Sequence, residues 1–153
     1  MIETLAALFL AHVLADYVFQ TAAMVETKKR PGTLLLHGAI VLLSLLVCFG
    51  TVTAPALYAL AAFHLVVDAI KVRAFGDTFQ PHLIDQILHL ASLVLVAAIA
   101  PDLWGIGAYA TIQWLPAVML LTAGSVYATR AGGFAVGKLM EPFQMPATQY
   151  SLP

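Results

Sequence analysis

The chain alternates between long apolar runs and short polar segments. The apolar runs cover roughly residues 5–24, 33–49, 56–70, 81–100 and 112–128. A helix needs about 20 apolar residues, at about 1.5 Å each, to cross the roughly 30 Å hydrocarbon core of a bilayer. The pattern therefore predicts an all-α integral membrane protein with about five transmembrane helices.

The apolar runs contain a small set of histidines and aspartates with a repeated spacing. In three of the runs a histidine and an aspartate lie four residues apart, and a further histidine lies early in the second run. The set consists of His12, Asp16, His37, His64, Asp68, Asp85 and His89. Residues four apart share one face of a helix. A charged residue at the centre of a membrane helix costs about 2.5–3.5 kcal/mol on insertion scales, so the repetition indicates a function.

The lysines and arginines predict the orientation of the spans. When the loops are assigned alternately to the two sides of the membrane, all seven basic residues fall on one side. They are Lys28, Lys29, Arg30, Lys71, Arg73, Arg130 and Lys138. The positive-inside rule makes that side the cytoplasm, which places the N-terminus outside and the C-terminus in the cytoplasm. We expect the cluster Lys28–Arg30 to have no role beyond setting the orientation, and we expect the side chain of Lys71 to extend to the membrane surface.

The composition agrees with a membrane protein and excludes other classes. Hydrophobic residues make up 61% of the 153 positions, charged residues make up 10%, and the mean hydropathy is +0.92. Soluble domains carry about 25% charged residues. The net charge of −1 gives no attraction to nucleic acid, and the single Cys48 excludes an internal disulfide. The length suits one transmembrane domain, residues 1–144, followed by an irregular cytoplasmic tail, residues 145–153.

The predicted orientation places the histidines and aspartates at a common depth. Counted from the ends of the spans, all seven lie within roughly 5–20 Å of the cytoplasmic boundary. Imidazole and carboxylate together bind zinc, iron or manganese without thiolates. A single pair is more typical of an interhelical hydrogen bond or salt bridge, such as His64 with Asp16. Three pairs and His37 at one depth favour instead one or two divalent metal centres, with zinc as the first choice, or proton chemistry.

Other polar residues have weaker assignments. Gln20 and Gln86 are expected to donate hydrogen bonds to metal ligands or between helices. His82 is expected to cap a helix or to lie at the membrane interface. Gly133 and Gly137 form a GxxxG pattern, which predicts close packing of helices.

Taken together, these residues give the chain a family likeness. It resembles a bacterial family of small multi-pass membrane proteins that is catalogued as a domain of unknown function. The matching pieces are His12–Gln20, Met24 with Lys28, His37, His64–Lys71, Asp85–His89 and Gly132–Glu141. The resemblance covers nearly the whole chain and implies a multi-pass protein of the bacterial inner membrane, but it implies no substrate. The pattern is also loosely similar to that of membrane-bound metal-dependent hydrolases, which carry His/Asp motifs near the membrane face.

The leading hypothesis is a metal-dependent hydrolase that acts on a lipid or a membrane-associated substrate from the cytoplasmic side. The four histidines of the set would bind the metal, and Asp16, Asp68 and Asp85 would be ligands or the catalytic base. One alternative is an ion, proton or small-solute transporter, which would need polar groups in both halves of the membrane. Another is an accessory subunit of a larger membrane complex, in which histidines bind haem or pigment. The expected partners are membrane lipids and a homo-oligomer or larger complex, and not nucleic acid.

Overall fold

The structure is a computed structural model that describes residues 1–76 and 78–143. Helices account for most of these residues. The described residues form helices and short connections, without strands. The α-helices are α1 (Ile2–Val13), α2 (Ala22–Thr27), α3 (Pro31–Phe49), α4 (Pro55–Ile70), α5 (Phe79–Ile99), α6 (Leu115–Val126) and α7 (Gly132–Met140). The expected cytoplasmic tail, residues 145–153, lies outside the described residues.

Among the described residues, four helical segments are long and apolar enough to cross a membrane, and they indicate a multi-pass membrane protein. The segments are Ile2–Phe19, Pro31–Phe49, Pro55–Phe75 and Phe79–Ile99. Large apolar side chains such as Leu43, Leu95 and Leu121 are more than half exposed, as expected where helices face lipid. The expected fifth span is helical from Leu115 onward but is not among these four segments, so its crossing of the membrane stays a prediction.

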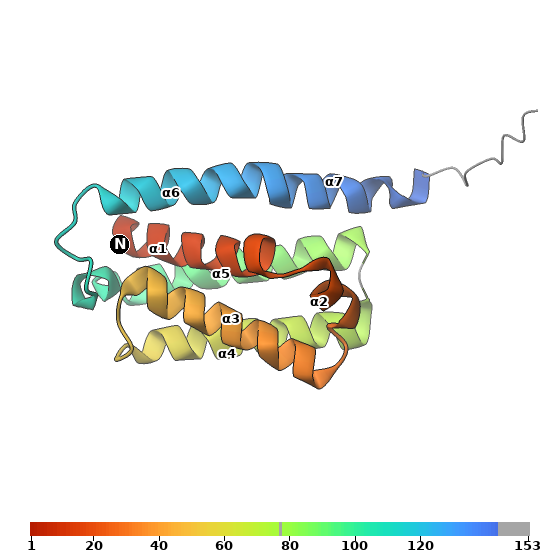
Figure 1. The fold of residues 1–153 in the computed structure, drawn as a ribbon, viewed down its shortest axis with the longest axis horizontal. Helices are drawn as coiled ribbons and strands as arrows, with labels where there is room; N and C mark the ends of the chain where they lie inside the picture. Colours follow the sequence, from red (N-terminus) through yellow and green to blue (C-terminus); the bar gives the residue numbers. More distant parts are fainter. Residues whose placement is uncertain (77, 144–153) are drawn as a thin grey trace, which may run out of the picture.

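Helix α1 lies at the centre of the bundle, in contact with α3, α5 and α6 (Figure 1). Helix α3 also packs on α4, and α4 packs on α5. Ala7 and Ala11 of α1 are buried at 0% and 1% exposure, and their small side chains allow neighbouring helices to approach closely. The polar faces of α1, α3, α4 and α5 therefore meet in one interior.

The first helical segment is shorter than the sequence predicted. The expected helix over residues 5–24 ends at Phe19, and Gln20 has an extended backbone. Thr21 then caps a new short helix, α2, because its side-chain oxygen accepts a hydrogen bond from the backbone N–H of Met24 at 3.3 Å. Gln20 therefore does not continue the helical face of His12 and Asp16.

Proline positions mark the starts of three helices. Pro31 is the first residue of α3. Pro55 is the first residue of α4, and Pro116 is the second residue of α6. A proline fits there because its missing N–H would have no partner within the helix.

Within residues 1–76 and 78–143, three π-helical turns interrupt the helices: Leu14–Phe19, Lys71–Phe75 and Tyr127–Ala131. They lie toward one end of the bundle, here called the basic end, where residues 28–30, 71–73 and 130–138 lie (Figure 1). π turns are rare and occur frequently at functional sites. Each of the three supplies a polar side chain, Asp16, Lys71 or Arg130, to the lining of one cavity.

The opposite end of the bundle is closed by close backbone contact. Thr4 donates a hydrogen bond to the carbonyl of Pro101 at 2.7 Å, and Phe49 packs edge-on against Trp104. Gly107 lies so close to this layer that a Cβ atom built on it would collide with the backbone oxygen of Phe49. This position therefore requires glycine for steric reasons.

Gly107→Ala is expected to lower the thermal unfolding temperature in detergent. Because the obstacle is backbone, the chain must shift, and overpacking of this kind costs about 1–3 kcal/mol. Gly105→Ala, two residues away, is the matched control, since a Cβ there would meet no atom within 4 Å. Equal melting temperatures for the two variants would contradict the close approach.

Candidate metal centre

The seven residues that the sequence grouped come together in the interior of the bundle. We call them the His/Asp cluster: His12, Asp16, His37, His64, Asp68, Asp85 and His89. They come from α1, the π turn that follows it, α3, α4 and α5. Six of them are buried, with His37 0% exposed and Asp68 and His89 each 1% exposed, and the side chain of Asp16 is 6% exposed. The predicted convergence of these faces is therefore what the structure shows.

Two histidines and two aspartates form the centre of the cluster. The Nε2 atoms of His37 and His64 are 3.2 Å apart. Each of these nitrogens lies 3.4 Å from Asp16 Oδ1, and they lie 3.2 and 3.4 Å from Asp68 Oδ2. Ligand atoms around a tetrahedral zinc ion, with bonds of about 2.0–2.1 Å, are separated by about 3.3 Å. These five separations therefore match the spacing of ligand atoms around one small divalent ion, which such a group could hold.

The carboxylates of the cluster use their two oxygens differently. Asp68 Oδ1 accepts a hydrogen bond from Lys28 Nζ at 2.8 Å, whereas Asp68 Oδ2, which faces the histidine nitrogens, accepts none in the part of the chain that the structure describes. In Asp16, Oδ2 accepts from Gln86 and Oδ1 lacks a hydrogen bond among the described residues. A buried carboxylate oxygen without a donor is costly. A cation between these oxygens would satisfy them.

A second group of donor atoms adjoins the first. His89 Nε2 lies 3.4 Å from Asp85 Oδ1, and within the described residues neither atom makes a hydrogen bond. The ring of His89 stacks on that of His64, with centroids 3.8 Å apart. Asp68 touches both groups, since its Oδ1 is 3.9 Å from His89 Nε2. In the part of the chain that the structure describes, three overlapping triads could hold a metal ion: His12–Asp16–His64, His37–His64–Asp68 and Asp68–Asp85–His89.

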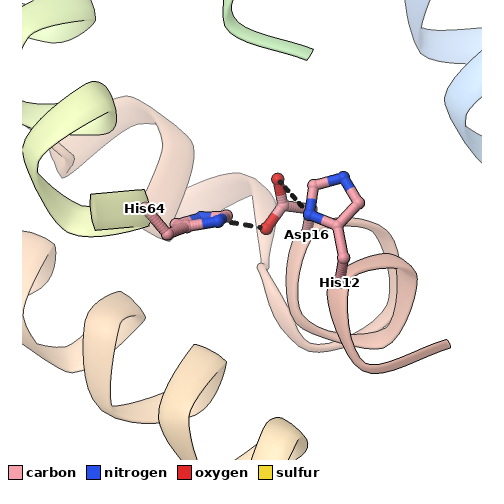
Figure 2. A group of neighbouring side chains, drawn as sticks. All are labelled: His12, Asp16 and His64. Atoms are coloured by element: carbon pink, nitrogen blue, oxygen red, sulfur yellow. Dashed lines mark ion pairs between the residues drawn. The ribbon is translucent and has the colours of Figure 1, made fainter. Parts of the chain in front are cut away.

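His12 lies at the edge of the cluster. Figure 2 shows the Asp16 carboxylate between the rings of His12 and His64, with ion-pair distances of 3.9 Å and 3.4 Å. The other ring nitrogen of His12, Nε2, is 3.3 Å from Gln86 Oε1. Gln86 also donates to Asp16 and to Asp85, which confirms the contact expected of this glutamine. Gln86 and His12 together orient the Asp16 carboxylate.

Two lysines belong to the site although the sequence assigned them other roles. Lys28 is only 7% exposed and pairs with Asp68, so it does more than set the orientation of the chain. Lys71 pairs with Asp85 at 3.1 Å, so the expectation that it extends to the membrane surface is wrong. Buried carboxylates need compensating charge. The turn at Gln20 places α2 against the start of α3, so Lys28 can supply that charge from outside the spans.

The remaining assignments from the sequence have mixed outcomes. His82 is buried and packs edge-on against Phe134, with centroids 4.9 Å apart, and so it does not lie exposed at an interface. A Cβ atom at Gly133 or Gly137 would meet nothing within 4 Å, so within the described chain no helix packs closely on this GxxxG pattern. Gln20 lies at the edge of a cavity, and its Nε2 makes no hydrogen bond to the described residues.

A cavity of about 470 Å³ connects the His/Asp cluster with the basic end. Asp16, Asp85 and Gln86 line its inner part, and these residues are buried or nearly so. Lys29 and Arg130 also line it and are exposed. The cavity therefore gives a solute at the basic end access to the carboxylates of the cluster.

A family comparison covers most of the chain. The model of a family described as a protein of unknown function (DUF3307) matches residues 4–116. This range contains the whole His/Asp cluster together with Lys28, Lys71 and Gln86. No curated protein and no solved structure matches the chain. Its function therefore has to be argued from the chemistry of the cluster.

Proposed function

We propose that this chain, which belongs to the DUF3307 family, is a membrane-embedded metal-dependent hydrolase that acts on a lipid or a membrane-associated substrate. The observation that carries the proposal is the arrangement of two imidazole nitrogens and two carboxylate oxygens at 3.2–3.4 Å, with oxygens that lack hydrogen bonds among the described residues. The cavity that reaches this arrangement supports a substrate that enters from the basic end.

The donor atoms favour zinc, with iron or manganese as alternatives. Imidazole and carboxylate ligands suit all three ions, and the separations suit four short bonds. His37, His64, Asp16 and Asp68 would hold the ion. A divalent ion bound by such residues supplies Lewis acidity and activates water near neutral pH. The protein residues would hold that ion, orient the substrate and move a proton.

The pair of Asp85 and His89 is the candidate proton acceptor. Asp85 Oδ1 is buried and without a hydrogen bond in the described chain, whereas Asp85 Oδ2 is held by Lys71 at 3.1 Å and Gln86 at 3.3 Å. One oxygen is thus fixed in place and the other is free to accept a proton. The same two residues could instead bind a second metal ion, which would share Asp68 with the first.

We further propose five spans in a bacterial inner membrane, with the N-terminus outside and the basic end in the cytoplasm. The gathering of the lysines and arginines at one end of the bundle supports this orientation (Figure 1). The fifth span would be α6, and the π turn and α7 would continue it at the cytoplasmic interface. The cavity would then open to the cytoplasmic side.

The test is the metal content of the purified protein together with hydrolysis. We expect elemental analysis of protein purified without chelator to give about one ion per chain, or two if Asp85 and His89 bind a second ion. Lipid and soluble ester substrates are then assayed before and after chelation, and activity is expected to disappear and to return with zinc, iron or manganese. A wild-type protein without stoichiometric metal would refute the metal centre, and a metal-loaded protein inactive on the whole panel would refute the hydrolase.

A further inference from the structure

The cavity at the basic end carries more positive charge than the His/Asp cluster uses. Of its four basic lining residues, Lys28 and Lys71 are paired with the buried Asp68 and Asp85. Lys29 and Arg130 are exposed, and neither forms an ion pair with any described residue. Two cations on the cavity wall are therefore available to a ligand.

Uncharged donors lie in the same lining. The hydroxyl of Tyr17 and Nε2 of Gln20 are buried atoms on cavity-lining residues, and neither makes a hydrogen bond within residues 1–76 and 78–143. Both can donate to an anionic oxygen. Arginine binds phosphate oxygens through paired N–H groups, and lysine binds them as a point charge. The two cations and the two uncharged donors together therefore suit a ligand group with several anionic oxygens.

The rest of the lining includes apolar side chains and carboxylates. Ala22, Val25, Val72 and Phe134 offer contacts to a hydrocarbon portion next to the polar group. Glu26 is an exposed carboxylate on the same lining, and the carboxylates of Asp16 and Asp85 line its inner part; all three oppose an anion. Lys71 pairs with Asp85, so the two unpaired cations balance the carboxylates of Glu26 and Asp16. A divalent ion in the adjacent cluster would add two further positive charges.

We propose that this cavity binds the phosphate group of a phosphate ester, with Lys29, Arg130, Tyr17 and Gln20 as its contacts. This inference gives the substrate class of the proposed hydrolase, and it rests on the proposed function for the reaction. Phosphate binding itself can be measured whether or not hydrolysis occurs. The phosphate ester can be a phospholipid headgroup or a water-soluble phosphate ester, because both present the same anion.

Binding is tested by native mass spectrometry of the full chain in dodecyl maltoside, with phosphatidic acid as one probe and glycerol 3-phosphate as the other. Phosphatidylcholine is the control lipid. We expect one phosphate ester per chain, and an apparent affinity at least about tenfold lower in the double variant Lys29→Gln/Arg130→Gln. Binding of phosphatidic acid alone would identify a lipid source, and equal binding of glycerol 3-phosphate would identify a soluble one.

Two further variants distinguish a specific binding site from general electrostatic attraction. Arg73→Gln removes an exposed charge from the same end of the bundle but not from the cavity lining, and it is expected to change affinity by less than about twofold. Glu26→Gln removes the opposing carboxylate and is expected to strengthen binding. An equal loss in Arg73→Gln, an unchanged double variant or equally tight phosphatidylcholine binding would each overturn the proposal.

The same measurements distinguish failure of this inference from failure of the proposed function. If the protein lacks stoichiometric metal but still binds phosphatidic acid through Lys29 and Arg130, the phosphate site is supported and the metal centre is refuted. If metal-loaded protein hydrolyses a substrate but binds neither phosphate ester, only the proposal of the phosphate site is refuted.

Discussion

Replacing His64 by alanine is expected to reduce the metal content of the purified protein from stoichiometric to near zero. His64 Nε2 lies 3.2–3.4 Å from His37, Asp16 and Asp68, so it belongs to two of the three candidate triads and to the central arrangement of four donors. Loss of a residue that only orients a ligand costs about 10–100-fold in metal affinity. Loss of the ligand itself should cost more than about 100-fold, measured by elemental analysis and by competition with a chromophoric chelator.

The control for this experiment is His82→Ala. His82 is a buried histidine on the same helix as His89, but it packs on Phe134 and is not part of the candidate triads. Both variants are analysed only as monodisperse protein, so that loss of metal is separated from loss of fold. His64→Ala with wild-type metal content would exclude the four-donor centre, and equal depletion in His82→Ala would mean that the loss reflects general destabilisation.

The sequence was sufficient to predict the His/Asp cluster because two independent patterns agreed. The spacing of four residues put His64 and Asp68 on one face, and the alternation of the basic loops put that face level with His37 and Asp85. Polar side chains within membrane spans are costly to expose to lipid, so polar helix faces at the same depth turn toward the interior of the bundle and meet there. The structure places these side chains within ion-pair distance of one another or of a shared partner.

The parts that the sequence could not supply depend on tertiary packing. The run Lys28–Arg30 contains three adjacent cations, and nothing local shows that only the first is buried. The π turn over Leu14–Phe19 likewise has no local signature, yet it ends the first helix early. One signal could have identified the lysines: buried aspartates such as Asp68 and Asp85 require countercharges at their own depth. Lys28 and Lys71 were the basic residues at that depth.

Replacing Lys28 by methionine is expected to destabilise the metal-free protein by about 3–5 kcal/mol, because it leaves the buried Asp68 carboxylate without its cation. Unfolding in lipid or mild detergent, after chelation, gives the measurement. Lys29→Met is the matched control: Lys29 is the next residue, exposed and without an ion pair to the described chain, so a change within about 0.5 kcal/mol is expected. Comparable stability in the two variants would contradict the assigned role of Lys28.

The metal state of the protein should change the size of this effect. If an ion binds Asp68 Oδ2, it compensates the same carboxylate that Lys28 holds through Oδ1, so Lys28→Met should cost less in metal-loaded than in chelated protein. The double variant Lys28→Met/Asp68→Asn removes both charges and should recover most of the stability of the chelated protein. It should also fail to bind metal, because it lacks a ligand. An equal cost of Lys28→Met with and without metal would show that the ion and the lysine do not share Asp68, and it would argue against Asp68 as a ligand.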